Sequence, residues 1–106
     1  MIQHAKKGLV LLMYTKITKN GQIRIPKKIQ NHLNLLEGHY LYIYESQKCI
    51  YIEKDHEDDT LNQCLFANDK VTIPMELRKL LNISNGTHLY LDVSDYNTIR
   101  LMKNDP

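Results

Sequence analysis

The sequence predicts a mostly β fold with short helices, in which two tandem repeats close on each other as one small β-barrel. Three observations lead to this prediction. The chain has 106 residues, which is the size of one domain with a buried core. It resembles itself when it is shifted by 48 residues. Each copy also alternates apolar and polar residues around turn signals, as half-buried strands do.

The internal repeat is the strongest of these signals. A shift of 48 residues aligns Ile25-Pro26 with Ile73-Pro74, and nine identities fall without a gap between residues 13 and 48. Apolar pairs such as Ile17 with Leu65 fill the positions between the identities. The sequence therefore predicts a single domain at 1–106, with a first repeat at 14–54, an acidic linker at 55–60 and a second repeat at 61–103.

The first repeat begins with two predicted strands. Residues 14–19 and 22–25 alternate around Asn20-Gly21, which is a strong signal for a β-hairpin. Successive residues of a strand point to opposite faces, so the apolar face is expected to enter the core. The apolar face carries Ile17, Ile23 and Ile25, and the opposite face carries Lys16, Thr18, Gln22 and Arg24.

A short helix and a second hairpin complete the repeat. Pro26 cannot donate a hydrogen bond in a sheet but suits the first turn of a helix, so a helix is predicted over residues 27–34. Residues 39–44 and 49–54 are rich in Tyr and Ile and are predicted to pair around Ser46-Gln47. The second repeat predicts the same order of elements.

Neither repeat is large enough to fold alone. A helix of this length is unstable by itself in water, and isolated hairpins are marginal. Two repeats in one chain can bury their apolar faces against each other, and their association is intramolecular. The sequence therefore predicts a pseudo-two-fold barrel within one chain.

The charge is uneven along a chain whose net charge is +2. Residues 1–54 contain nine lysines and arginines against three glutamates, whereas residues 55–106 contain five against nine acidic residues. Such an asymmetry predicts an anionic partner for the first half, and a solvated surface is the alternative.

Several classes of protein are disfavoured. No apolar run approaches the roughly twenty residues of a membrane span, so no membrane partner is expected. Two cysteines without a CxxC pattern favour a reducing cytoplasm. The five histidines show no metal-ligand spacing, so neither a metal nor a cofactor is expected. No catalytic motif is present and a chain of this size leaves little room for a pocket, so we expect no enzyme and no catalytic residues.

Two segments resemble a known family. The first is KITKNGQIRIP at residues 16–26, followed by a short helix and Gly38, and the second is DKVTIPMELRKLLNI at residues 69–83. Both are similar to the AbrB/SpoVT/MazE-type swapped-hairpin domain of bacterial regulators, and together they extend over about residues 14–103. The resemblance implies a double swapped-hairpin, AbrB-like β-barrel whose hairpins interlock. It also implies that basic residues on the first hairpin and at the helix start bind duplex DNA.

The chain departs from the family pattern in both copies. The turn glycine Gly21 is replaced by Asp69 in the second copy, which predicts a different turn there. These departures leave the operator sequence open. Positions at which the AbrB branch carries arginine hold Gln22, Gln30 and Asn31 in the first copy, and Lys70, Arg78 and Lys79 in the second.

The candidate DNA contacts are polar and basic side chains. A two-stranded ribbon fits the major groove, where Arg pairs with guanine and Gln with adenine. Lys27 and Lys28 stand in the first turn of a predicted helix, where a cation opposes the macrodipole, so a phosphate partner is the interpretation and plain solvent exposure the alternative. The predicted DNA-binding residues are Lys16, Thr18, Lys19, Gln22, Arg24, Lys27, Lys28, Lys70, Arg78 and Lys79.

The two copies are expected to contribute unequally. In the second copy the matching outward face reads Cys64, Phe66, Lys70 and Thr72, which is much less basic. The first copy is therefore expected to dominate DNA binding. An exposed Phe66 would mark a contact between chains, whereas a buried phenylalanine is the commoner outcome.

The sequence thus favours a sequence-specific, duplex-DNA-binding transcriptional regulator. The alternative is the antitoxin of a toxin–antitoxin pair, which would bind a toxin protein and its own promoter. Only four residues, 103–106, follow the last predicted strand, so the acidic tail usual in such antitoxins is missing. A homodimer of the two-repeat chain stays open, as do the contributions of residues 9–12 as a strand and of Lys6-Lys7 as a DNA-binding arm.

Overall fold

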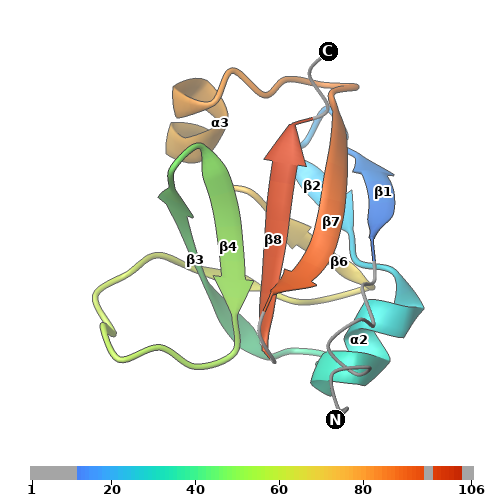
Figure 1. Ribbon diagram of the computed structural model, residues 1–106, viewed down its shortest axis with the longest axis vertical. Helices are drawn as coiled ribbons and strands as arrows, with labels where there is room; N and C mark the ends of the chain where they lie inside the picture. The colour runs from blue at the N-terminus through green and yellow to red at the C-terminus, as the bar shows by residue number, and fades with distance from the viewer. Residues whose placement is uncertain (1–11, 95–96, 104–106) are drawn as a thin grey trace, which may run out of the picture.

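The computed structural model describes residues 12–94 and 97–103, and the predictions for residues 1–11 lie outside this range. The order strand, strand, helix, strand, strand occurs twice along the described chain, and the predicted mostly β fold with short helices is confirmed (Figure 1). The elements are β1 (Met13–Lys16), β2 (Gln22–Arg24), α2 (Lys27–Leu33), β3 (Tyr40–Ser46), β4 (Cys49–Glu53), β5 (Gln63–Leu65), β6 (Lys70–Thr72), α3 (Met75–Leu80), β7 (His88–Ser94) and β8 (Thr98–Lys103).

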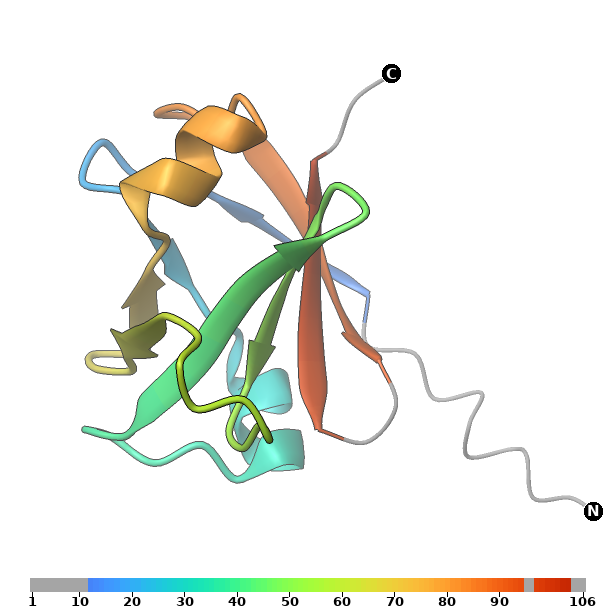
Figure 2. The same ribbon diagram turned by 90° about the vertical axis from the view of Figure 1, so that its left-hand side faces the viewer.

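The strands form one large sheet and one ribbon. Six strands lie in a sheet in the order β1-β7-β8-β4-β3-β5, and β2 pairs with β6 as a separate two-stranded ribbon. Strands from the two halves of the chain pair with each other, β1 with β7, β3 with β5, β4 with β8 and β2 with β6, all antiparallel. The two halves therefore build a common structure, as both views of the ribbon diagram show (Figures 1 and 2).

The predicted pairing of residues 14–19 with residues 22–25 is wrong beyond the turn. The turn itself forms, because the Gly21 N–H donates to the Thr18 carbonyl and the Thr18 N–H donates to the Gln22 carbonyl, each at 2.9 Å. The strands then separate, since β1 pairs with β7 and β2 pairs with β6. Alternation along a strand identifies its buried face but does not identify its partner.

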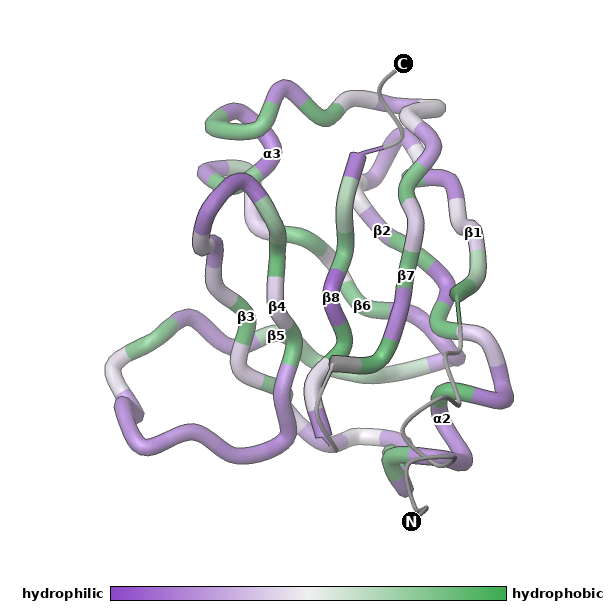
Figure 3. The backbone as a smooth tube through the Cα atoms, viewed as in Figure 1, coloured by the Kyte–Doolittle hydropathy of each residue, from purple (hydrophilic) through white to green (hydrophobic). Residues whose placement is uncertain are grey.

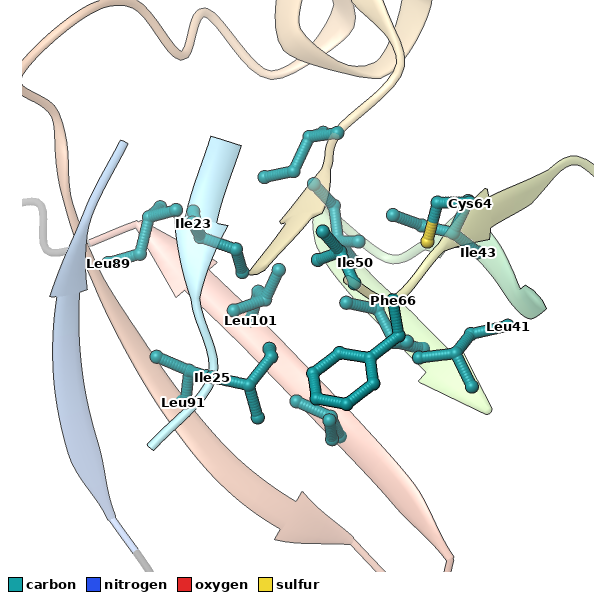
Figure 4. Close-up of a cluster of buried hydrophobic side chains, with 14 of the residues drawn as sticks. Ile23, Ile25, Leu41, Ile43, Ile50, Cys64, Phe66, Leu89, Leu91 and Leu101 are labelled. Carbon is teal, nitrogen blue, oxygen red and sulfur yellow. The ribbon is translucent and has the colours of Figure 1, made fainter. Parts of the chain in front are cut away.

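The hydrophobic core lies between the ribbon and the inner face of the sheet (Figure 4). Ile23 and Ile25, in and just after β2, lie beside Leu89 and Leu91 of β7 and Leu101 of β8, and all five are at most 1% exposed. Ile17 is buried as well, so the predicted apolar face of the first two strands is confirmed. The long loop between β4 and β5, which contains the acidic linker, is strongly hydrophilic (Figure 3).

The first helix and the β3–β4 hairpin form close to their predicted positions. α2 ends at Leu33, and Ile29 and Leu33 are buried as their spacing predicts. β3 and β4 pair with Ser46 opposite Cys49, so the turn falls on Gln47-Lys48, one residue later than predicted. Both turn residues have positive φ, 52° and 68°, which is the geometry of a type I′ hairpin turn.

The outward face predicted for the second copy is wrong at Cys64 and Phe66. These two side chains are only 6% and 2% exposed, whereas Leu65 between them is 43% exposed. The hydrogen bonds show that Phe66, not Leu65, is the counterpart of Ile17. The Ile17 N–H donates to Thr87 and its carbonyl accepts from Gly86, and Phe66 makes the equivalent bonds with His39 and Gly38.

A shorter turn causes this difference. Ala67 and Lys70 exchange backbone hydrogen bonds of 3.1 and 3.0 Å around a two-residue turn, Asn68-Asp69, whereas three residues separate Thr18 from Gln22. Asn68 and Asp69 both have positive φ, 54° and 66°. The different turn predicted from the missing glycine is thus confirmed. Because this turn is one residue shorter, each residue of β5 faces the side opposite to the one that the ungapped repeat predicts.

The two cysteines test the placement of β5. Burial raises the pKa of the Cys64 thiol to about 12, and Cys49 is partly exposed. We expect iodoacetamide to alkylate Cys49 in the folded protein and to reach Cys64 only after unfolding, because the thiolate is the reactive form. Peptide mass spectrometry distinguishes the two sites. Cys49→Ser should stay unlabelled until it unfolds, and rapid labelling of Cys64 in the folded chain would contradict this placement.

Candidate nucleic-acid interface

The ribbon of β2 and β6 presents the candidate interface. Its two central residues, Ile23 and Val71, lie opposite each other and face the core, at 0% and 1% exposure. The residues on either side of them therefore face away from the core. These outward residues, which we call the ribbon face, form two cross-strand pairs, Gln22 with Thr72 and Arg24 with Lys70.

A proline and a short helix follow each strand of the ribbon. β2 leads through Pro26 into α2, and β6 leads through Pro74 into α3, so the helices lie at opposite ends of the ribbon (Figure 2). Four exposed lysines flank the ribbon face. They are Lys27 and Lys28 in the first turn of α2, Lys19 in the β1–β2 loop and Lys79 near the end of α3.

Asp69 joins the ribbon to α2. Its carboxylate accepts hydrogen bonds from Gln30 Nε2 at 3.1 Å and Arg24 Nη1 at 3.2 Å, and Lys27 Nζ lies at 3.3 Å. The hydrogen bond from Gln30, followed by that from Lys27, lowers the pKa of the Asp69 carboxyl below its ordinary value. The group is therefore ionised at neutral pH and partly neutralises two of the predicted DNA contacts.

These ion pairs leave the cations accessible. The side chains of Arg24 and Lys27 are 60% and 74% exposed, so water and salt screen their attraction to Asp69. The ion pair with Asp69 nevertheless offsets part of the unfavourable interaction between Lys27 and the helix dipole. Lys28 is exposed and makes no ion pair within the described residues, so its interpretation as a phosphate ligand stays a prediction.

Two predicted contacts, Arg78 and Thr18, also hold the ends of the ribbon in place. Arg78 Nε donates to the Ile73 carbonyl at 2.9 Å, and its guanidinium packs against Gly21. Thr18 Oγ1 accepts hydrogen bonds from the N–H groups of Asn20 and Gln22, at 3.3 and 3.1 Å, and so closes the β1–β2 loop. Both side chains therefore have structural roles. Lys16 is exposed, but it ends β1 opposite His88 in the six-stranded sheet, so the prediction that it shares a face with Gln22 and Arg24 is wrong.

A surface groove of about 530 Å³ runs beside the ribbon face. Gln22, Lys70 and Thr72 line it from the ribbon, and β5 contributes Gln63 and Leu65. Most of these side chains offer hydrogen-bond donors or acceptors. Neither this groove nor the Asp69 contacts were predicted from the sequence. Both depend on which segments the topology brings together.

The outer face of the sheet is aromatic rather than basic. Tyr44 and Tyr51 stack with ring centroids 5.5 Å apart, and burial together with a hydrogen bond to Glu53 raises the pKa of Tyr44 to about 12. The guanidinium of Arg100 on this face is held by two hydrogen bonds to Asp92, at 3.1 and 2.6 Å. This face therefore offers fewer accessible cations than the ribbon face and its flanks.

Within the described residues, no three His, Cys, Asp or Glu side chains gather as metal ligands. Among the described residues, no helix has both the length and the apolar character needed to cross a membrane. Comparisons of the chain with models of protein families, with curated proteins and with solved structures found no match.

Proposed function

We propose that this chain is a sequence-specific, duplex-DNA-binding transcriptional regulator of the AbrB-like type. The observation that carries the proposal is the ribbon face. Its polar and basic side chains stand on a narrow two-stranded ribbon whose opposite face is buried in the core. A two-stranded β-ribbon fits the major groove, and Arg, Lys, Gln and Thr are side chains that contact base edges there.

Reciprocal contacts support a structure of two interlocked repeats. The Ile25 N–H donates to the Asp69 carbonyl and the Ile73 N–H donates to the Gly21 carbonyl, both at 2.8 Å. The two bonds are equivalent in the repeat, because a shift of 48 residues relates Ile25 to Ile73 and Gly21 to Asp69. Together with the pairing of strands from opposite halves, they support a swapped-hairpin barrel with a pseudo-two-fold axis through the ribbon.

The flanking lysines support contact with the DNA backbone. Exposed lysines lie beyond both ends of the ribbon face, where they would meet phosphates if a groove received the ribbon. Phosphate contacts fix the position of a protein on the duplex, and contacts to base edges supply the specificity. In the proposed complex the lysines therefore position the chain, and the ribbon face reads the sequence.

We expect affinity for duplex DNA to fall about a thousandfold between 50 and 200 mM salt. This slope corresponds to roughly six neutralised phosphates, whose counterions are released on binding. Fluorescence anisotropy of a labelled pool of duplexes measures it. Binding that is insensitive to salt over this range would contradict a phosphate-driven interaction.

Substitutions separate the two roles. Arg24→Ala is expected to lower both affinity and sequence preference, whereas Lys28→Ala should weaken binding to all duplexes alike. Lys48→Ala, in the β3–β4 turn, is the matched control and should leave binding unchanged. Equal losses of DNA affinity for the three variants would show that the ribbon face has no specific role in DNA binding.

Asp69→Asn is expected to raise the affinity for DNA about threefold to tenfold. The substitution removes a negative charge beside Arg24 and Lys27 that competes with phosphate, while the amide oxygen can still accept the hydrogen bond from Gln30. The same anisotropy assay measures the change. Asp59→Asn, an exposed acid of the β4–β5 loop, controls for net charge. An unchanged or lower affinity for Asp69→Asn would show that Asp69 does not oppose binding.

A further inference from the structure

The two ends of the ribbon face carry different chemistry. The pairing of β2 with β6 is symmetric about Ile23 and Val71, so a two-fold rotation would exchange the two cross-strand pairs. The side chains do not follow this symmetry. Arg24 and Lys70 place two cations in one cross-strand pair, whereas the pair of Gln22 and Thr72 carries no charge. In a symmetric homodimer the two pairs would be identical.

The backbone does not differ in the same way. The two equivalent hydrogen bonds at the ends of the ribbon, from Ile25 to Asp69 and from Ile73 to Gly21, are both 2.8 Å long. Each helix is also fastened to the preceding strand by a side chain at the same position. Gln30 Nε2 donates to the Ile25 carbonyl at 2.7 Å, and Arg78 Nε donates to the Ile73 carbonyl at 2.9 Å. The ends of the ribbon therefore have similar frames and different side chains.

An acidic group adds to the difference. The Asp69 carboxylate lies beside Arg24, with 3.2 Å between its oxygen and Nη1. Its counterpart Gly21 has no side chain, and the guanidinium of Arg78 fills that space. A carboxylate accepts hydrogen bonds from the amino groups of cytosine and adenine and offers nothing to a guanine acceptor. Base readout is therefore expected to differ further at the Arg24 end.

The flanking lysines do not share this asymmetry. Lys27 and Lys28 lie at the α2 end, and Lys19 and Lys79 lie at the end near α3. Contacts of lysine with phosphate hold a duplex without reading its sequence. The cations at both flanks can thus hold both backbones of a groove, and the groups that face the bases supply the difference in base readout.

We infer that the protein recognises a DNA site without dyad symmetry and binds it in a single orientation. This inference rests on the proposed function. Arg and Lys pair with O6 and N7 of guanine, whereas Gln pairs with adenine and Thr contacts the thymine methyl group. Two residues along a strand span about 6.6 to 6.8 Å, close to two base-pair steps of roughly 3.4 Å. The expected site therefore has a G·C pair at one end and an A·T pair about two steps away.

Selection from random duplexes tests this inference. The full chain is used to retain duplexes from a randomised 20-base-pair pool at fixed salt, and the retained pool is sequenced. The wild type is expected to enrich a motif that is not its own reverse complement. The double variant Gln22→Lys with Thr72→Arg joins an arginine to a lysine in both cross-strand pairs. It is expected to shift the enriched motif toward an inverted repeat, with a remaining difference at the Asp69 end. Lys48→Ala should enrich the wild-type motif.

A second double variant symmetrises the ribbon face in the opposite sense. Arg24→Thr with Lys70→Gln makes both pairs uncharged, and it is expected to lose the guanine preference and to bind at least tenfold more weakly. All four substitutions lie on the outward face, and circular dichroism verifies that each variant folds. If one variant does not fold, the other provides the comparison with the wild type.

The outcomes separate this inference from the proposed function. An inverted repeat selected by the wild type, or retained duplexes without a common motif, would overturn the inference and leave DNA binding intact. An unchanged motif in the symmetrised variants would also overturn it. A wild-type chain that retains no duplex at all would overturn the proposed function together with the inference.

Discussion

Phe66→Ala is expected to lower the free energy of unfolding by about 3 to 5 kcal/mol. Phe66 is 2% exposed, and its ring projects into the cluster of buried side chains (Figure 4). Truncation removes the buried ring and leaves a cavity that the surrounding side chains fill only in part. Guanidinium chloride unfolding followed by circular dichroism measures the loss.

Leu65→Ala is the matched control for this prediction. Leu65 is adjacent in sequence but 43% exposed, so its truncation should change the free energy of unfolding by no more than about 0.5 kcal/mol. Comparing the two variants shows which face of β5 is buried, the one with Phe66 or the one with Leu65. A greater loss for Leu65→Ala than for Phe66→Ala would mean that the strand faces the other way, as the ungapped repeat predicts.

Gly21→Ala is expected to lower the free energy of unfolding by about 2 to 4 kcal/mol. Gly21 has a φ of +79°, which costs an alanine about 1 to 2 kcal/mol. A Cβ at this position would also lie 2.5 Å from Arg78 Cζ. Moving the guanidinium away would weaken the hydrogen bond from Arg78 Nε to the Ile73 carbonyl, which contributes a further loss of about 1 to 2 kcal/mol.

Gly38→Ala separates the two causes of this loss. Gly38 has a φ of +88°, but a Cβ there would meet no atom within 4 Å. Its substitution should therefore show only the backbone cost. Thermal and denaturant unfolding of both variants, and of Gly21→Ala combined with Arg78→Ala, measure the difference. Equal losses for the two glycine variants, or strictly additive losses in the double variant, would mean that Arg78 and Gly21 do not pack together.

Features set by neighbouring residues were predictable from the sequence. The start of α2 follows from Pro26 and the spacing of Ile29 and Leu33, and the burial of Ile23 follows from alternation. The pairing partner of each strand depends on residues far away in the sequence and was not predictable in this way. Asn20-Gly21 does form a turn, but the strands on either side of it belong to the sheet and to the ribbon. Local patterns cannot choose between a neighbouring strand and a distant one.

The ungapped repeat predicts the wrong buried face for β5, because the turn after β5 is shorter than its counterpart in the first repeat. A turn with one residue fewer shifts the counterpart of Ile17 from Leu65 to Phe66. The signal was present in the sequence, because Cys64 and Phe66 are apolar residues two positions apart and suit a buried face. Their hydrophobicity therefore indicates the buried face better than the ungapped repeat does.

The candidate interface was predictable only in part. Alternation predicted that Gln22 and Arg24 face away from the core, and the structure places both on the ribbon face. The contacts of Asp69 were not predictable, because Arg24 is 45 residues away along the chain. Only the pairing of β2 with β6 brings the carboxylate to that arginine. The sequence therefore identified the cations but not the acid that lies among them.

The most direct test of the ribbon face as a DNA interface is a titration of the isotope-labelled protein with a duplex, followed by the amide chemical shifts. We expect the largest changes at Gln22, Arg24, Lys70 and Thr72, with small changes at Tyr44 and Tyr51 on the outer face of the sheet. Changes confined to the tyrosine-bearing face, or a ribbon that does not respond to saturating DNA at low salt, would contradict the proposed interface.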